Sequence, residues 1–140
     1  TLLHHKFIHT IATPTLPQLV LAEVINTGLY DRHLRLARET YHRRSRELRD
    51  LVAEHFPADT RLSQPRGGLV AWIELPRRID TTALYHAAHS EGILFAPGEL
   101  FSVSGQFRNC LRISYAQGWE GERSRQMARL GQLMKAALQS

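Results

Sequence analysis

The stretch LVAWIEL at residues 69–75 decides how this sequence folds. One set of alternate positions in it is wholly apolar and the other is mixed: Leu69, Ala71, Ile73 and Leu75 against Val70, Trp72 and Glu74. Because successive side chains of a strand point to opposite faces, this alternation predicts a strand that buries one face only. Gly67 and Gly68 predict a turn before the strand, and Pro76 ends it.

A second alternating stretch, CLRISY at residues 110–115, predicts another strand of the same kind. Residues 60–64 and the apolar residues 93–96 (ILFA) are shorter strand candidates. Helices are predicted over residues 81–91, with Asp80 as N-cap, and over residues 120–138. The order of these elements is β-β-α-β-β-α, which predicts a small open sheet with helices packed on one face.

Two helices are predicted before the sheet. The first covers residues 15–28, with Thr15 as N-cap and Gly28 as its end, and the second covers residues 31–54, capped by Asp31. The second helix carries a buried stripe with spacings of three and four residues: Leu34, Ala37, Tyr41, Ser45, Leu48 and Val52.

The predicted fold class is therefore α/β (α+β), with a mostly antiparallel sheet of about four strands and two N-terminal helices. At 140 residues, a single domain over 1–140 is expected, with a helical lead-in over 1–56 and the β-β-α-β-β-α lobe over 57–140.

The basic charge does not indicate a nucleic-acid-binding domain. The chain carries a formal net charge of +5, but its 18 basic residues are spread along the sequence and 16 of them are arginines. Phosphate binding needs clustered positive charge, whereas arginine also forms planar ion pairs with carboxylates. An autonomous nucleic-acid-binding domain is therefore the weakest of the functions considered.

Other common functional motifs are missing from the sequence. A single cysteine, Cys110, excludes an intrachain disulfide and a CxxC pair and favours a reducing, cytoplasmic compartment. The pairs His86/His89 and His5/His9 have helical spacing, but no carboxylate or thiol accompanies them, so we expect no metal site.

Neither a GxSxG nucleophile motif nor a Gly-rich phosphate loop occurs. No segment has the length and apolarity of a membrane span. The chain opens in an apolar stretch without an initiating Met, so we expect it to be part of a longer protein.

Arg112 is the candidate binding residue. It lies within the predicted strand 110–115, on the face that it shares with Cys110 and Ser114. An arginine inside an apolar strand is rarely buried without a partner. Two explanations fit: a structural salt bridge on an edge strand, or a planar fork that binds the carboxylate of a ligand through two hydrogen bonds.

Four stretches taken together resemble a known family: GLYDRHLRLARETYHRRSRELRDLV (28–52), PRGGLVAWIELP (65–76), GILFAPGELFS (92–102) and FRNCLRISYA (107–116). They are similar to the C-terminal part of MocR-type regulators of the GntR superfamily, in which a winged helix-turn-helix precedes a domain like the fold-type I, pyridoxal-phosphate-dependent aminotransferases. The resemblance implies that this chain is the small lobe of that domain. It also implies that Arg112 binds the α-carboxylate of an amino acid or similar effector, and that Gly67-Gly68 and Pro97-Gly98 are structural.

The resemblance places the cofactor outside this chain. Pyridoxal phosphate is held as a Schiff base on a lysine, and the family's lysine precedes the two helices at residues 15–54. Lys6 matches a later position of the pattern, and Lys135 lies on an outer helix. We therefore expect the complete protein to bind pyridoxal phosphate, and this chain alone to bind cofactor negligibly and to catalyse nothing.

The partners follow from the same resemblance. They are an amino acid or amino-acid-like effector, the large lobe of the same protein, DNA through an N-terminal winged-helix domain, and a second copy in a homodimer; no membrane is expected. The alternative is a genuine class I/II aminotransferase, in which Arg112 positions a substrate. The YDRHLR and FRNCLR runs favour the regulator.

Overall fold

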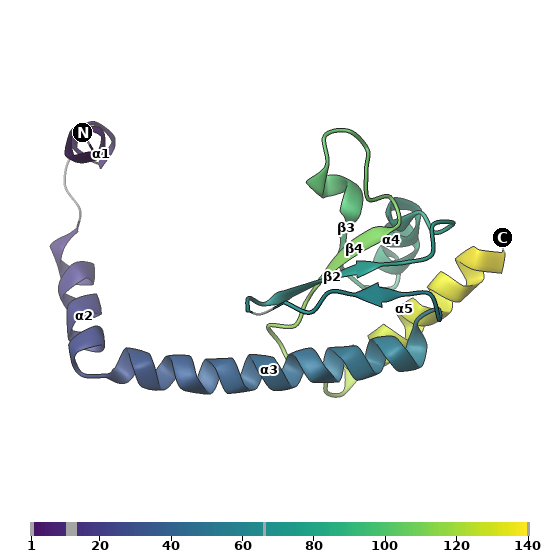
Figure 1. Ribbon diagram of the computed structural model, residues 1–140, viewed down its shortest axis with the longest axis horizontal. Helices are drawn as coiled ribbons and strands as arrows, with labels where there is room; N and C mark the ends of the chain where they lie inside the picture. The colour runs from purple at the N-terminus through teal and green to yellow at the C-terminus, as the bar shows by residue number, and fades with distance from the viewer. Residues whose placement is uncertain (1, 11–13, 66, 140) are drawn as a thin grey trace. The chain divides into compact units, whose positions relative to one another are not determined.

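The computed structural model describes residues 2–10, 14–65 and 67–139 of the chain (Figure 1). It divides into two compact units, Thr1–Glu39 and Thr40–Ser140. The first unit is helical and the second contains the sheet, with one helix contributing to both. The fold class expected from the sequence is confirmed by the mixed α/β architecture and its antiparallel sheet.

The first unit contains α1 (Leu2–Thr10), α2 (Thr15–Asn26) and the start of α3 (Leu29–His55). Helix α1 lies within the helical lead-in expected over residues 1–56, although no separate helix was assigned to residues 2–10. Gly28 separates α2 from α3 with a φ of 72°, a left-handed conformation that suits glycine.

Two predicted caps are wrong. Pro14 occupies the N-cap position of α2, so Thr15 is already helical. Asp31 lies in the first turn of α3, because that helix begins two residues earlier than expected. A carboxylate in the first turn still stabilises the helix through its dipole, so Asp31 favours α3 without capping it.

The sheet of the second unit has four strands: β1 (Arg61–Leu62), β2 (Val70–Glu74), β3 (Ala96–Pro97) and β4 (Cys110–Ser114). Their order is β1-β2-β4-β3, and each neighbouring pair is antiparallel. Strands β2 and β4 form the centre, and Trp72 lies directly opposite Arg112 in their register. The two central strands are those that the alternating stretches predicted.

The outer strands differ from the prediction. Of the predicted strand 60–64, only Arg61 and Leu62 pair with a neighbouring strand. The predicted strand 93–96 is wrong, because β3 begins at Ala96. The Ile93 amide donates to the Ala88 carbonyl at the end of the preceding helix, so this segment closes a helix before it reaches the sheet. Ile93 and Phe95 are buried in the core, which explains their apolarity without strand pairing.

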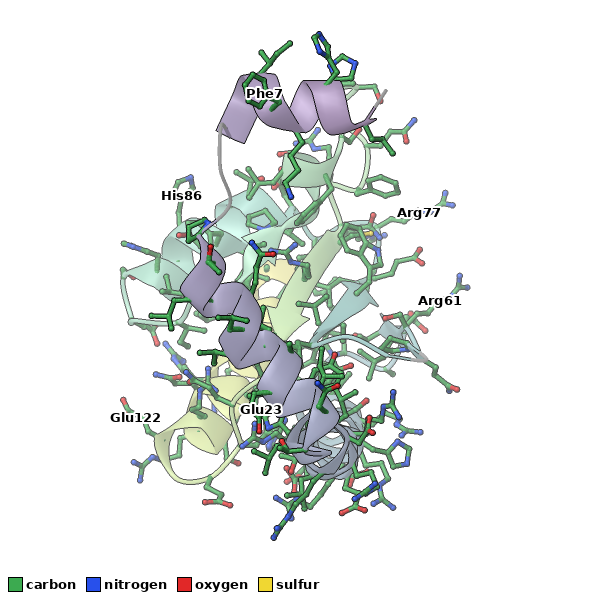
Figure 2. The ribbon with its side chains drawn as sticks, turned by 90° about the vertical axis from the view of Figure 1, so that its left-hand side faces the viewer. Phe7, Glu23, Arg61, Arg77, His86 and Glu122 are labelled. Carbon is green, nitrogen blue, oxygen red and sulfur yellow. The ribbon has the colours of Figure 1, made fainter. Side chains whose placement is uncertain are left out.

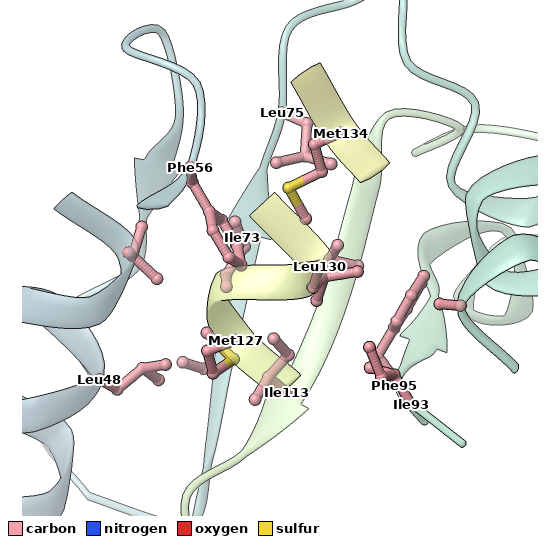
Figure 3. Close-up of a cluster of buried hydrophobic side chains, with 14 of the residues drawn as sticks. Leu48, Phe56, Ile73, Leu75, Ile93, Phe95, Ile113, Met127, Leu130 and Met134 are labelled. Atoms are coloured by element: carbon pink, nitrogen blue, oxygen red, sulfur yellow. The ribbon is translucent and has the colours of Figure 1, made fainter. Parts of the chain in front are cut away.

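The core lies on one face of the sheet, and Figure 3 shows its central side chains. Helix α4 (Thr81–His89), helix α5 (Glu122–Gln139) and the end of α3 provide its helical side. Asp80 caps α4 as predicted, accepting hydrogen bonds from the amides of Thr82 and Ala83. Among the most deeply buried side chains of the strands and helices are Leu48, Ile73, Leu111, Leu130 and Met134.

Helix α5 approaches the end of α3 closely at one glycine. A Cβ atom at Gly131 would collide with the His55 carbonyl oxygen and lie 2.8 Å from the carbonyl carbon. Both neighbouring atoms belong to backbone, so no side-chain rotation relieves the collision. The distance between these two helices therefore depends on glycine at position 131.

Candidate functional site

Arg112 lies at the centre of β4, on the face of the sheet opposite the core. Strand β4 pairs with β2 on one side and β3 on the other, so Arg112 is not on an edge strand. Its side chain is exposed. Within the parts of the chain that the structure describes, no ion pair joins it to a carboxylate, which removes the structural salt bridge considered from the sequence.

An aromatic ring contacts the Arg112 guanidinium instead. Its Cζ atom lies 4.7 Å from the centre of the Phe101 ring, within the range of a cation–π interaction. The Phe101 ring in turn meets Trp72 edge-on, with ring centres 5.5 Å apart. The Phe107 ring also meets the Trp72 ring edge-on, with ring centres 5.5 Å apart and an angle of 88° between the ring planes. Three aromatic rings and one arginine thus form a cluster on the open face of the sheet.

The short helix η1 (Gly98–Phe101) positions Phe101. Gly98 begins this helix in close contact with β4: an added Cβ would collide with the Phe107 carbonyl oxygen and lie 2.7 Å from that of Cys110. Only glycine fits there, so the structural role expected for Pro97-Gly98 has a steric basis. Phe107 itself adopts a left-handed conformation with a φ of 64°.

The loop that carries Phe107 is fixed to helix α4. The Arg108 guanidinium lies 2.6 Å from Asp80 and 3.4 Å from Glu99. The Thr82 hydroxyl also donates to Glu99, at 2.7 Å. The hydrogen bond from Arg108 lowers the pKa of Asp80, and Asp80 raises the pKa of Arg108. Both carboxylates are therefore engaged by a residue other than Arg112.

The remaining carboxylate on this face has its own partner. Glu74 lies on β2 two residues beyond Trp72, and its oxygen is 4.0 Å from the guanidinium of Arg61. With Glu74 and Glu99 both paired elsewhere, the N–H groups of Arg112 remain available. An exposed guanidinium of this kind can bind a carboxylate through two parallel hydrogen bonds.

Cys110 shares the face of Arg112 but does not provide a nucleophile. Its side chain is buried, and burial raises the pKa of its thiol. The thiolate, which is the reactive form, is therefore disfavoured. The chemistry that the exposed guanidinium of Arg112 supports is recognition of an anion.

The other sequence candidates are scattered. His86 and His89 are exposed on α4 and contact the ring of Tyr85; Figure 2 shows His86 at the surface. His5 is exposed on α1, and the side chain of His9 lies outside the described part of the chain. No group of three potential metal-binding side chains occurs among the residues described.

The charged side chains are dispersed, as the sequence indicated. Arg61 and Arg77 extend from the surface of the second unit (Figure 2). Arg129 instead forms a two-pronged ion pair with Glu91, at 2.7 and 2.8 Å, which joins α5 to the end of α4. Of the helices that the structure describes, none is long and apolar enough to cross a membrane.

The lysines of this chain do not fit the site of pyridoxal phosphate. Both Lys6, on α1, and Lys135, on α5, are exposed. A Schiff-base lysine lies in a pocket that encloses the cofactor, whereas both of these side chains lie on helix surfaces in contact with water. We therefore derive no catalytic step from either lysine.

Sequence reasoning assigned no role to Trp72 or Phe101. The alternation in residues 69–75 contained the signal for Trp72, because it placed a large aromatic residue on the face opposite the core. Phe101 gave no such signal. Its proximity to Arg112 follows from the return of η1 over β4, which involves residues eleven positions apart.

A family comparison matches residues 5–130 to aminotransferase class I and II. Among curated proteins, the chain is 34% identical to the uncharacterized HTH-type transcriptional regulator YjiR of Escherichia coli, over 82% of this chain and 24% of that protein. It is 30% identical to 2-aminoadipate transaminase of Thermus thermophilus, over 90% of this chain and 32% of that enzyme. The chain thus spans about a third or less of the relatives it matches.

Solved structures agree on the fold. The alpha-aminoadipate aminotransferase LysN of Thermus thermophilus, in complex with N-(5'-phosphopyridoxyl)-L-leucine, superposes with a TM-score of 0.82 and 30% identity, over 97% of this chain and 35% of that one. A multiple substrate aminotransferase of Thermococcus profundus gives a TM-score of 0.87 over 96% of this chain and 34% of that one, at 24% identity. The predicted similarity of the fold to the aminotransferases is confirmed.

Proposed function

The chain belongs to the aminotransferase class I and II family, and from this premise we propose that it is the C-terminal lobe of an effector-sensing domain in a MocR-type transcription regulator. The complete protein then binds an amino acid or a similar compound and adjusts its contact with DNA. The observation that carries the proposal is the exposed guanidinium of Arg112, held on the open face of the sheet without a carboxylate partner in the described chain.

Arg112 binds the α-carboxylate of the effector in this proposal. A guanidinium fork fixes both the position and the plane of a carboxylate, so it orients the rest of the ligand. Glu74 and Glu99 do not compete, because Arg61 and Arg108 engage them. This chain therefore supplies recognition and orientation.

The complete protein is proposed to bind pyridoxal phosphate through its large lobe, which lies outside this chain. When bound, the cofactor supplies an aldehyde that condenses with amines. The phosphopyridoxyl compound in the LysN complex is consistent with such a site in the family. The proposal also includes a cytoplasmic location, a homodimer, and DNA binding through a winged-helix domain outside these residues.

The second candidate is a genuine aminotransferase, in which Arg112 positions a substrate. The 30% identity to 2-aminoadipate transaminase favours it, and the 34% identity to YjiR favours the regulator. The coding sequence upstream of Thr1 discriminates between them. A winged helix-turn-helix followed by a lysine-bearing lobe supports the regulator, whereas a lobe without that module supports the enzyme.

The role of Arg112 is tested by ligand titration of the complete protein loaded with pyridoxal phosphate. Calorimetry against each of the twenty standard amino acids measures affinity, and the tightest of them is used for the variants. Arg112→Ala is expected to weaken that affinity by about 10- to 150-fold, the scale of hydrogen bonds to a charged group.

Arg77→Ala is the matched control, because Arg77 is an exposed arginine of the same unit and takes no part in the ion pairs that engage Glu74 and Glu99. The affinity of this variant for the amino acid should stay within about twofold of that of the unmutated protein, since exposed substitutions away from the site have small effects. Equal affinities of Arg112→Ala and the unmutated protein would remove Arg112 from the site. Binding of none of the twenty amino acids would contradict the proposed amino-acid effector.

A further inference from the structure

The contact between Phe101 and Arg112 leaves the guanidinium free where a ligand needs it. The guanidinium carbon of Arg112 lies over the Phe101 ring at 4.7 Å, a contact that takes up none of its N–H groups, whereas carboxylates bind to the N–H edges. A salt bridge inside the protein would occupy those edges. The aromatic contact therefore restricts the movement of the arginine side chain and leaves its hydrogen-bond donors available to a ligand.

We propose that Phe101 is a positioning residue for Arg112, which fixes the plane of the guanidinium so that its N–H edge is presented to the carboxylate of the ligand. This inference rests on the proposed function, because it takes Arg112 as the carboxylate-binding group. Phe101 acts through Arg112 and needs no contact with the ligand itself.

Two further contacts hold Phe101 in place. Trp72, opposite Arg112 in the strand register, is partly buried and meets Phe101 edge-on at 5.5 Å. Gly98, at the start of the same short helix, fits tightly against the backbone of β4. Because both ends of η1 rest on the two central strands, the Phe101 ring has a defined place above Arg112.

The length of the arginine side chain explains why a positioning residue matters here. An arginine side chain has about 2 kcal/mol of rotamer freedom. Arg61 engages Glu74 and Arg108 engages Glu99, so neither carboxylate holds the Arg112 guanidinium in place. Without the ring, Arg112 would sample other orientations, in which its N–H edge is turned away from the ligand.

The test substitutes Phe101→Leu in the complete, cofactor-loaded protein, which removes the ring but keeps an apolar side chain. Affinity is measured for the tightest-binding standard amino acid and for the amine that lacks its carboxylate. The amino acid should bind about 3- to 30-fold more weakly, the scale of a cation–π contact, while the amine should bind unchanged. Phe101→Tyr, which keeps a ring, should retain the affinity.

Phe107→Leu is the matched control. Phe107 is 44% exposed and Phe101 43%, and both rings meet Trp72 at 5.5 Å, but the contact with Arg112 belongs to Phe101. The control should change affinity for the amino acid by less than about twofold. Equal losses in the two variants, or equal losses for amino acid and amine, would mean that the rings serve the fold alone and would overturn the proposal.

Failure of this proposal is distinguishable from failure of the proposed function. If Arg112→Ala weakens binding and Phe101→Leu does not, Arg112 binds the carboxylate without support from the ring. If neither variant weakens binding, the carboxylate site itself is wrong. A crystal structure of the complete Phe101→Leu protein provides a readout independent of affinity: Arg112 should leave its position above residue 101, and an unmoved guanidinium would contradict the positioning role.

Discussion

The two faces of the central strands have opposite properties. On the core face, Ala71, Ile73, Leu111 and Ile113 are all at most 7% exposed. On the open face, Val70 is 41% exposed, and Trp72 and Arg112 stand beside it on the same pair of strands. A pleated strand allows this division because its side chains alternate. The comparison indicates that stability depends on the core face, and it leaves the open face available for the recognition proposed above.

This division explains why the two faces tolerate different residues. The core face excludes water, so a lost methyl group leaves a cavity that neighbouring atoms fill only in part. The open face keeps its polar groups near water, where a charge needs no buried partner. Arg112 is therefore compatible with the fold without a buried partner.

The largest expected effect is on the core face. Ile73→Ala should lower the free energy of unfolding by about 2–5 kcal/mol, because Ile73 is completely buried. Val70→Ala, three residues earlier on the open face, should lower it by less than about 0.5 kcal/mol. Urea unfolding followed by tryptophan fluorescence measures both, since Trp72 and Trp119 lie in this unit. Similar losses of unfolding free energy in the two variants would contradict the distinction between the two faces.

Gly131 allows a test of how closely the helices pack over the core face. Gly131→Ala gains about 1 kcal/mol of helix propensity, but crowding in a packed interior costs about 1–3 kcal/mol. The collision with the His55 backbone makes the second effect larger, so we expect a net loss of up to about 2 kcal/mol. Gly67→Ala is the control, because nothing lies within 4 Å of its Cβ position. A stabilised Gly131→Ala protein in the same urea experiment would contradict the tight packing.

The ion pairs at the edge of the open face predict a dependence on pH. Because Arg108 lowers the pKa of Asp80 in the folded state, the stabilisation is present above the ordinary pKa of about 4 and is lost as pH falls through the lowered value. Asp80→Asn keeps the N-cap oxygen but not the charge. At pH 7 it should be less stable by about 0.5–1 kcal/mol, and this difference should shrink in acid. A difference that is constant from pH 7 to 2 would exclude the pair as its source.

The smallest expected effect belongs to Arg112. Arg112→Ala should change the free energy of unfolding by less than about 0.5 kcal/mol, because the side chain is exposed and has no ion pair in the described chain. Together with a large loss of ligand affinity, this result would separate recognition from stability. A loss of several kcal/mol would instead place Arg112 among the residues that hold the sheet.

The central strands were predictable because their alternation is strong, and Asp80 was predictable as a cap because its carboxylate reaches two amides. The boundaries of β3 were not predictable from the sequence. The buried side chains of ILFA (93–96) pack into the core, and strand pairing starts only at the last residue of this stretch, Ala96. Arg112 stood out as a charge in an apolar strand. Its contact with Phe101 could not be read from the sequence, because it depends on how η1 folds back.

Arg44 links helix α3 to the segment that follows β4. Its guanidinium donates to the Ala116 carbonyl, and its own carbonyl accepts a hydrogen bond of 2.9 Å from the Trp119 indole. A single residue thus anchors the chain at two points, four and seven positions after Arg112. Any rotation of this turn of α3 would move the segment that follows β4, so this part of the helix and the strand that carries Arg112 are mechanically linked.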